Sequence, residues 1–391
     1  MMRKKLAGAL LATAMLSALL MGCSSQQAET EAAAEAQTTA QAEASADETE
    51  AEETEAETEE ASGEFNPDNE DGVSIEEVRE EFGATPLPAD GTTVGVVAKQ
   101  FQNEFWRIFK DGYEASAEKI AADQGIDFTV DVQAAQSETD ETGQLAILNN
   151  MVNKQYAAVL CSPISDGNLV PGIETANEQG IPTVNVNDGL IANADYFVGP
   201  RAYQNGELAA EWISEKLGGE GQVAIVIGMP KAFAARQRTL GFEEWCAANA
   251  PGIEIVAKQN ADWDRQKSKE LAQNWITQYP DLKAIFCNND GMALGVVEAT
   301  EEYKEETGKD ILVVGVDGIG EAYDSIRAGK LDATIDSFPY YMSQIALECG
   351  LRVMGGQELP RVVWTPQALI DSTNVDTPAE EIINWVDTSF E

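Results

Sequence analysis

The chain contains no histidine, and its aromatic and basic residues are few. Of 391 residues, 7% are aromatic, and 25 Lys and Arg stand against 68 Asp and Glu, for a net charge of −43. The lack of histidine excludes Ser-His-Asp and Cys-His catalysis and His-based metal sites. Because there is no basic stripe, nucleic acid is not an expected partner. Paired carboxylates at Asp290 and Asp317 are the remaining route to an enzyme, and we expect a binding protein instead.

Glycine is missing where a nucleotide phosphate would need it. The turn after the first predicted strand, residues 99–103, has no glycine, and no Walker-type loop precedes Gly308 and Lys309. We therefore expect no cofactor, and the sequence indicates no metal site.

Cysteines are few and irregularly spaced. Cys161 and Cys287 end apolar strand-like runs, whereas Cys246 and Cys349 lie in helical patterns, without CxxC or metal-type spacing. Buried free thiols are the expectation. An exported location permits disulfides, but the sequence identifies no pair.

The longest apolar run lies at the N-terminus and is too short for a comfortable membrane span. Residues 6–21 follow three basic residues, a pattern typical of an export signal. The ending at residues 20–23, Leu-Met-Gly-Cys, resembles the lipobox of bacterial lipoproteins. It implies a signal peptide over residues 1–22 and a lipid on Cys23. The lipid would hold the protein to the outer face of the cell membrane, the periplasmic side in a Gram-negative host. An ordinary cleaved signal that contains a cysteine is the alternative.

Residues 23–72 form an acidic segment. Residues 24–72 include 17 Asp and Glu and no Lys or Arg, among Ala, Thr, Gln and Ser. Such a composition cannot bury enough apolar surface to offset the entropy of ordering, so we predict a disordered tether. Transient helix is the alternative.

From residue 73 onward the pattern is that of a folded α/β protein. A capping box at residues 74–77 predicts a short helix that ends near Gly83, within a lead-in of residues 73–91. Helices and strands then alternate. The predicted strands are 94–98, 128–132, 157–160, 182–186, 196–198, 222–227, 254–257, 283–286, 311–316, 333–335 and 367–370. The predicted helices are 104–124, 141–154, 169–179, 202–217, 232–249, 265–279, 292–307, 321–328 and 341–354. Repeated βα units predict parallel sheets covered on both faces, and the strands are too many for one sheet. We therefore predict two α/β lobes.

Two strand ends carry the most informative polar residues. The apolar runs that lead into residues 286–290 and 314–318 each end in Asn, Asp or Gly. In an open α/β sheet, ligands bind just beyond the carboxyl ends of the strands. Amides and carboxylates there indicate a site for a hydroxylated molecule. Asp290 directly precedes a helix and is expected to be its N-cap.

Several stretches together resemble the bacterial substrate-binding proteins for simple sugars, of the ribose- and galactose-binding kind. They are NEFW at 103–106 with KDG at 110–112, AARQR at 234–238 with GF at 241–242, ADWD at 261–264, NNDGMALG at 288–295 and VGVDG at 314–318. The resemblance covers residues 93–370 and implies the type I periplasmic-binding-protein fold, in which two Rossmann-like lobes with parallel sheets are joined by three crossovers. The implied first lobe is 92–200 plus 338–366, and the implied second lobe is 201–337 plus 367–391.

The resemblance also implies one sugar held between the lobes. Aromatic rings cover the C–H faces of a sugar, while Asn, Asp and Arg pair with its hydroxyls. The implied ligand residues are Asn103, Phe105, Trp106, Asn187, Arg238, Trp263, Asn289, Asp317 and Ser337, with Lys99, Asp188 and Arg236 as further candidates. A turn, cap or core role is the alternative for each.

The matching positions leave the identity of the sugar open. Ribose-type members have Asp-Arg where this chain has Asn187 and Asp188, and Ser337 stands where the family usually has Asn or Gln. The resemblance implies a lipid-anchored monomer that delivers a monosaccharide or related polyol to an ABC permease and its ATPase. A ligand-presenting subunit for a chemoreceptor or sensor kinase is the alternative. A sugar-responsive repressor would need a DNA-binding helix-turn-helix, and this chain has a signal and an acidic segment in its place.

Overall fold

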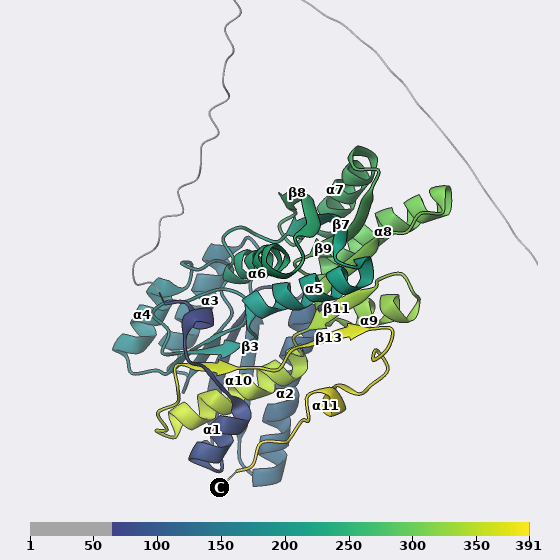
Figure 1. Ribbon diagram of the computed structural model, residues 1–391. Coiled ribbons are helices and arrows are strands. Elements are labelled where there is room, and N and C mark those ends of the chain that lie inside the picture. The colour runs from purple at the N-terminus through teal and green to yellow at the C-terminus, as the bar shows by residue number, and fades with distance from the viewer. Residues whose placement is uncertain (1–64, 391) are drawn as a thin grey trace, which may run out of the picture. The chain divides into compact units, whose positions relative to one another are not determined.

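The computed structural model describes residues 65–390, which include the whole predicted α/β body (Figure 1). The expected signal peptide, Cys23 and most of the expected tether lie outside the described residues. Within the described range, no helix has both the length and the apolar character needed to cross a bilayer.

The first lobe is built on a seven-stranded sheet in which all neighbouring strands are parallel, in the order β1-β12-β6-β5-β4-β2-β3. Its strands are β1 (Val73–Ser74), β2 (Thr92–Ala98), β3 (Phe128–Ala134), β4 (Val159–Cys161), β5 (Thr183–Val186), β6 (Tyr196–Gly199) and β12 (Val362–Trp364). Its helices are α1 (Ile75–Phe82), α2 (Glu104–Gln124), α3 (Glu141–Asn153), α4 (Val170–Glu178) and α10 (Pro339–Met354).

The second lobe is built on a six-stranded sheet in the order β13-β11-β10-β9-β7-β8. Its strands are β7 (Glu220–Ile227), β8 (Gly252–Asn260), β9 (Leu282–Cys287), β10 (Leu312–Asp317), β11 (Ala333–Asp336) and β13 (Ala368–Asp371). Its helices are α5 (Ala202–Leu217), α6 (Phe233–Asn249), α7 (Arg265–Gln278), α8 (Asp290–Thr307) and α9 (Gly320–Arg327), and a short α11 (Ala379–Ile382) follows β13. The other neighbouring strands of this sheet are parallel, as predicted, and the edge strand β13 runs antiparallel to β11.

Helix α2 illustrates why these residues form these elements. The Asn103 side chain caps it by accepting a hydrogen bond from the N–H of Phe105, and Gly125 ends it in the left-handed conformation. Phe105, Phe109 and Tyr113 recur at helical spacing and are buried. The ends of α2 and its buried face are therefore encoded locally, and the predicted bounds coincide with those observed.

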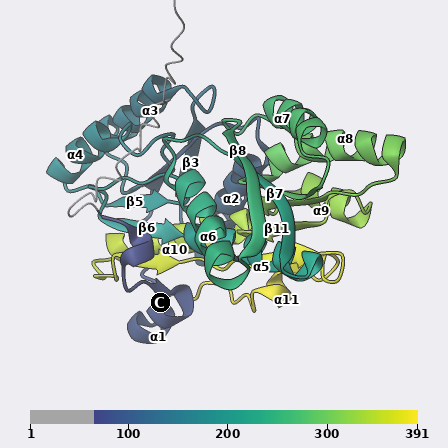
Figure 2. The same ribbon diagram turned by 45° about the horizontal axis from the view of Figure 1, so that its top comes forward.

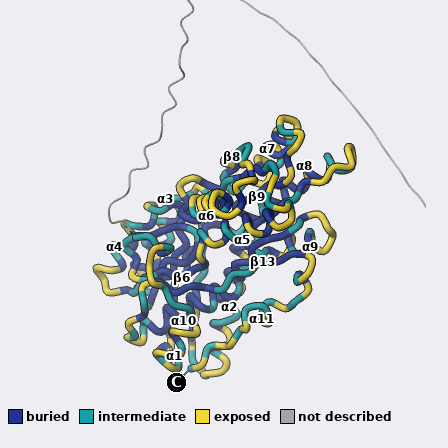
Figure 3. Tube along the Cα trace, viewed as in Figure 1, coloured by how far each residue is buried: buried dark blue, intermediate teal, exposed yellow. Residues whose placement is uncertain are grey.

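The strands form the buried centre of each lobe, and helices cover both faces (Figures 1 and 2). Figure 3 shows buried residues along the strands and exposed ones on the outer turns and helix faces. Every residue of β4, β5 and β12 is buried. Strands covered on both faces are continuously apolar rather than alternating. The prediction of two lobes of α/β build is confirmed.

The chain passes between the two sheets three times, from β6 to α5, from β11 to α10 and from β12 to β13. Strands β1 and β12 were not predicted, because each has only two or three residues and no clear period. β12 pairs with β6, and β1 pairs with β12, so these short pieces complete the edge of the first sheet.

The two ends of the described chain differ from the sequence expectations. Residues 67–69 form a 3-10 helix with a buried Pro67, so a part of the segment expected to be tether has regular structure. Phe65 packs against an apolar cluster of Phe197, Val362 and Trp364. The C-terminal residues, expected in the second lobe, return to the first, where the N–H of Thr85 donates to the carbonyl of Ser389 (2.8 Å).

The four described cysteines, Cys161, Cys246, Cys287 and Cys349, are buried free thiols, as predicted. Burial raises the pKa of the Cys246 thiol to about 11, with Glu243 nearby adding to the shift. These thiols are therefore protonated at neutral pH and pack as small apolar side chains.

The capping box of α1 gives a first testable prediction. The Ser74 hydroxyl accepts from the N–H of Glu77 (3.3 Å), and the Glu77 carboxylate accepts from the N–H of Ser74 (2.7 Å). Ser74→Ala should lower the free energy of unfolding by about 1 kcal/mol, because it leaves a helix N–H unpaired. Ser74→Asp keeps an acceptor and should restore most of the loss in urea denaturation. Equal stability of the Ala variant and the wild type would contradict a role for this cap.

Candidate ligand-binding site

The carboxyl ends of both sheets supply the polar residues of the site. In the first lobe, Lys99 follows β2, Glu138 lies in the loop after β3, and Asn187 with Asp188 follows β5. In the second lobe, Trp263 follows β8, Asn289 follows β9 and Asp317 ends β10. This is the edge at which open α/β sheets bind ligands.

A small cavity lies where these residues meet. Residues of both lobes line it: Asn103, Phe105, Trp106, Glu138, Asn187, Asp188, Arg238, Trp263, Asn289 and Asp317. All except Glu138 are candidates from the sequence. The structure therefore brings nine of the twelve candidate residues of the folded body around one space.

A larger cleft adjoins this cavity and shares Asn103, Glu138 and Trp263 with it. Acidic and basic side chains from both lobes, such as Asp140 and Lys231, line the cleft. The cleft therefore connects the cavity to the protein surface. Among the described residues, no cluster of His, Cys, Asp or Glu has the arrangement of a metal site.

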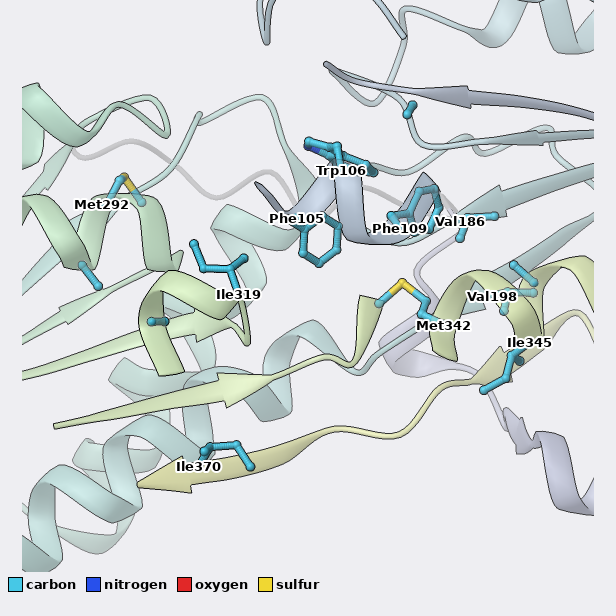
Figure 4. Packing of buried hydrophobic residues seen from close by; sticks show 14 of the residues in the cluster. Phe105, Trp106, Phe109, Val186, Val198, Met292, Ile319, Met342, Ile345 and Ile370 are labelled. Atoms are coloured by element: carbon cyan, nitrogen blue, oxygen red, sulfur yellow. The ribbon is translucent and has the colours of Figure 1, made fainter. Parts of the chain in front are cut away.

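Aromatic rings from both lobes line the cavity. Phe105 and Trp106 pack edge to face with centroids 4.9 Å apart, on the face of α2 shown in Figure 4. From the second lobe, the Trp263 ring lies against Gly228, where an added Cβ would come within 2.2 Å of the indole. The Trp263 ring can occupy this position because Gly228 has no side chain. Flat apolar surfaces from both lobes suit the C–H faces of a ring-shaped ligand.

Arg238 and Asp317 form a buried charged pair beside these rings. One Nη of Arg238 donates to the carbonyl of Asn288 (2.7 Å) and lies 3.7 Å from Oδ1 of Asp317. The Nε of Arg238 is buried and has no partner among the described residues. Burial raises the pKa of Asp317 well above its usual value, although Arg238 opposes the shift. Unpaired buried donors and a desolvated carboxyl are groups that a bound hydroxyl would satisfy.

Asn103 and Asn289 combine a cap with a place in the cavity wall. The Oδ1 of Asn289 accepts from the N–H of Met292 (2.9 Å), which makes Asn289 the N-cap of α8. Asn103 caps α2 in the same way. Each cap uses only the amide oxygen, so the amide NH₂ group remains available to a ligand.

The prediction that Asp290 caps α8 is wrong, because Asn289 occupies that position. Asp290 is the first residue of the helix, and its carboxylate accepts from the N–H groups of Gly318 (2.8 Å) and Ile319 (3.1 Å) and from the hydroxyl of Thr334 (2.7 Å). Burial raises its pKa to about 6. These bonds hold the turn that follows β10, and so they position Asp317.

Three further candidates lie outside the cavity lining. Lys99 is fully buried behind it, paired with Asp188 and 5.9 and 5.8 Å from the rings of Trp106 and Trp263. Ser337 is buried and its hydroxyl has no partner among the described residues. Arg236 pairs with Asp166 on the outside of the lobe junction. Lys99 and Ser337 directly follow β2 and β11, and Arg236 lies in the first turn of α6. The sequence could not show the directions of their side chains.

Glu138 is the lining residue that sequence reasoning missed. Its carboxylate accepts from Nε1 of Trp106 (3.2 Å) and Nε2 of Gln100 (3.3 Å) and lies 4.0 Å from Lys99. Burial raises its pKa, and Lys99 opposes the shift. The predicted strand ended six residues earlier, so Glu138 looked like an ordinary loop acid. Its position just after a first-lobe strand was the available signal.

Backbone strain is concentrated at the same place. Asn187, Trp263 and Asp317 have φ values of 60°, 65° and 138°, all in the region that non-glycine residues rarely adopt. Such conformations persist where the surrounding structure holds them, and they cluster at ligand sites.

The raised pKa of Asp317 predicts pH-dependent binding. A ligand hydroxyl that donates to Asp317 favours the ionised form of this carboxyl. The affinity is therefore highest above the pKa that Asp317 has in the ligand-free protein, and it falls as the pH is lowered through that pKa. Binding should weaken by at most about tenfold per pH unit as the pH is lowered, measured by titration calorimetry. Asp317→Asn should bind weakly and lack most of this pH dependence. A flat profile in the wild type would contradict the role.

Two α/β lobes with a cavity lined by residues of both lobes define the class of solute-binding proteins that hold a ligand between lobes. The family model "Periplasmic binding protein domain" matches residues 94–358, and the chain belongs to this family. Members of this family are binding proteins for solutes outside the cytoplasm.

Similar proteins have been characterised in several bacteria. The chain is 30% identical over 278 residues to the ribose import binding protein RbsB of Bacillus subtilis, covering 71% of this chain and 86% of that protein. It is 36% identical over 253 residues to the D-allose-binding periplasmic protein of Escherichia coli, covering 62% and 78%. A solved ABC-transporter solute-binding protein from Actinobacillus succinogenes with bound D-allose has a TM-score of 0.68 at 29% identity, covering 73% of this chain and 100% of that one.

Proposed function

We propose that this protein captures a monosaccharide or a related polyol between its two lobes and delivers it to an ABC permease. This proposal rests mainly on the cavity between the lobes, which joins aromatic faces from both lobes to buried Asn, Asp and Arg side chains. The relatives named for ribose and D-allose support this ligand class.

The proposed location is outside the cytoplasm, with the protein held to the membrane through a lipid on Cys23. The family supports the extracytoplasmic part, and the lipobox-like sequence supports the anchor. Metabolic labelling with a fatty-acid probe tests the anchor, since Cys23→Ser should abolish labelling.

Thermal-shift screening of the mature chain tests the ligand class. D-Allose, D-ribose and myo-inositol are the first probes, because similar proteins are named for or solved with them. A ligand at 1,000 times its Kd stabilises the folded state by about 4.1 kcal/mol, which raises the melting temperature by several degrees. The proposal fails if no sugar or polyol raises the melting temperature while another metabolite class does.

A further inference from the structure

The two lobes contact each other beside the cavity, where the first turn of α6 meets the first lobe. Helix α6 has no side-chain cap of its own. Instead, the N–H of Phe233 donates to Oδ1 of Asp166 (3.2 Å), and the N–H of Ala234 donates to the backbone carbonyl of Asp188 (2.9 Å). Both acceptors belong to the first lobe, so the helix of one lobe is capped by the other.

Asp166 is bonded on both sides of this junction. Its Oδ1 also accepts from the N–H of Leu190 (3.0 Å), which fixes the carboxylate within the first lobe. Its Oδ2 pairs with Arg236, which lies one turn into α6 and also donates to the carbonyl of Pro230 (3.2 Å). A carboxylate at a helix N-terminus is favoured by the partial positive charge there.

An apolar cluster covers the junction next to these bonds. Leu190 from the first lobe packs with Ala202, Phe233 and Ala234, and Phe65 lies against the cluster. The Asp166 and Arg236 side chains remain 30% and 46% exposed, so their ion pair alone contributes modestly. The backbone bonds to Asp166 and this cluster are therefore the larger part of the contact.

We propose that Asp166 is an interlobe latch, a positioning residue that stabilises the closed arrangement and thereby tightens the hold on the ligand. The inference rests on the proposed function and extends it to a residue outside the cavity. The bonds from α6 to Asp166 exist only while the lobes are together, so they add to the free energy of closure. Arg238 lies in the same helix, two residues beyond Arg236, so the latch also fixes the helix that brings Arg238 to the cavity.

Affinity measurements on the full mature chain test the latch, with D-allose and D-ribose as probes. Asp166→Ala should raise the Kd about tenfold, mainly through faster dissociation, whereas Asp166→Asn keeps an acceptor oxygen and should raise it about threefold. Arg236→Gln should raise it about twofold, and the effect in the double variant with Asp166→Ala should be less than additive. Asp324→Ala is the matched control, because it removes an exposed Asp–Arg pair (3.1 Å to Arg327) within one lobe.

A closure measurement separates failure of the latch from failure of the proposed ligand class. Dyes on Glu178→Cys in α4 and Glu306→Cys in α8, both exposed positions, report the distance between the lobes by energy transfer. Asp166→Ala should lower the closed fraction with and without sugar, while Asp324→Ala leaves it unchanged. Unchanged affinity and closed fraction in Asp166→Ala would overturn the latch. If the wild type binds no sugar, the proposed function fails, and the closed fraction of the sugar-free protein still decides the latch.

Discussion

Asp317→Ala should abolish sugar binding while leaving the folded protein intact. In the wild type, Asp317 lines the cavity, is buried and faces Arg238 at 3.7 Å. An ionised carboxylate can accept two hydroxyl hydrogen bonds, and each bond to a charged group contributes about 1.5–3 kcal/mol. The variant also leaves Arg238 without its counter-ion. The Kd should therefore rise by about 10³-fold or more in titration calorimetry.

The same change has two opposed effects on the stability of the ligand-free protein: it removes a buried carboxyl, and it leaves the buried Arg238 without a counter-ion. Burial raises the pKa of Asp317 well above its usual value. Because the pKa of Asp317 is higher in the folded than in the unfolded state, its contribution to the free energy of unfolding is fully present below the unfolded-state pKa. This contribution is lost as the pH rises through the folded-state pKa. At neutral pH the carboxyl is ionised in the unfolded chain, so burying it opposes folding, whereas the loss of the Arg238 counter-ion lowers stability; the melting temperature should therefore change less than either effect alone would change it. Asp317→Asn is the matched control of equal shape. Wild-type affinity in the Ala variant would show that Asp317 is not in the ligand site.

Trp263→Ala should weaken binding about 100-fold. The indole lies against Gly228 and lines the cavity from the second lobe, as the aromatic residues of α2 do from the first. Its loss opens one wall of the cavity to water and removes the apolar surface that covers one face of the sugar. Loss of a large buried aromatic contact typically amounts to about 2–4 kcal/mol in binding. Because the residue has a φ of 65°, part of any change in stability will come from relief of strain.

Trp263→Phe separates the two properties of this side chain. Phenylalanine keeps a flat apolar face but lacks Nε1–H, which is buried in the wild type without a partner among the described residues. If the ring face dominates, the Phe variant should bind within about tenfold of the wild type. Trp275→Phe, in a buried position on α7 outside the cavity lining, is the control for a general loss of stability. The assignment is wrong if Trp263→Ala binds sugar as tightly as the wild type.

Local sequence signals accounted for most of the secondary structure. Asn103 and Gly125 mark both ends of α2, and the capping box at Ser74 marks the start of α1. These signals act over a few residues, so they can be recognised without the fold. Strand β12 escaped prediction because three buried residues have no period, and pairing with distant β6 is what makes them a strand.

In the candidate site, too, some residues could be identified from local sequence signals and others only from the fold. Asn289, Trp263 and Asp317 could be identified because they sit at strand ends within distinctive stretches. Asp290 was misassigned, because its carboxylate bonds to a turn 28 residues further along the chain. Glu138 was missed because its position in the cavity depends on the path of a loop, and Arg236 lies at the lobe junction rather than in the cavity.

The sequence by itself determined the alternation of strands and helices, the two-lobed α/β class and the residue types available at the strand ends. Those properties follow from short-range periodicity, capping and turn chemistry, which each stretch of chain carries alone. Only the tertiary structure decided which side chains share the cavity, how Asp290 holds the turn after β10, and that Asp166 of one lobe caps a helix of the other. Those properties depend on contacts between residues far apart in the chain, and such contacts exist only once both sheets have formed and the lobes have met.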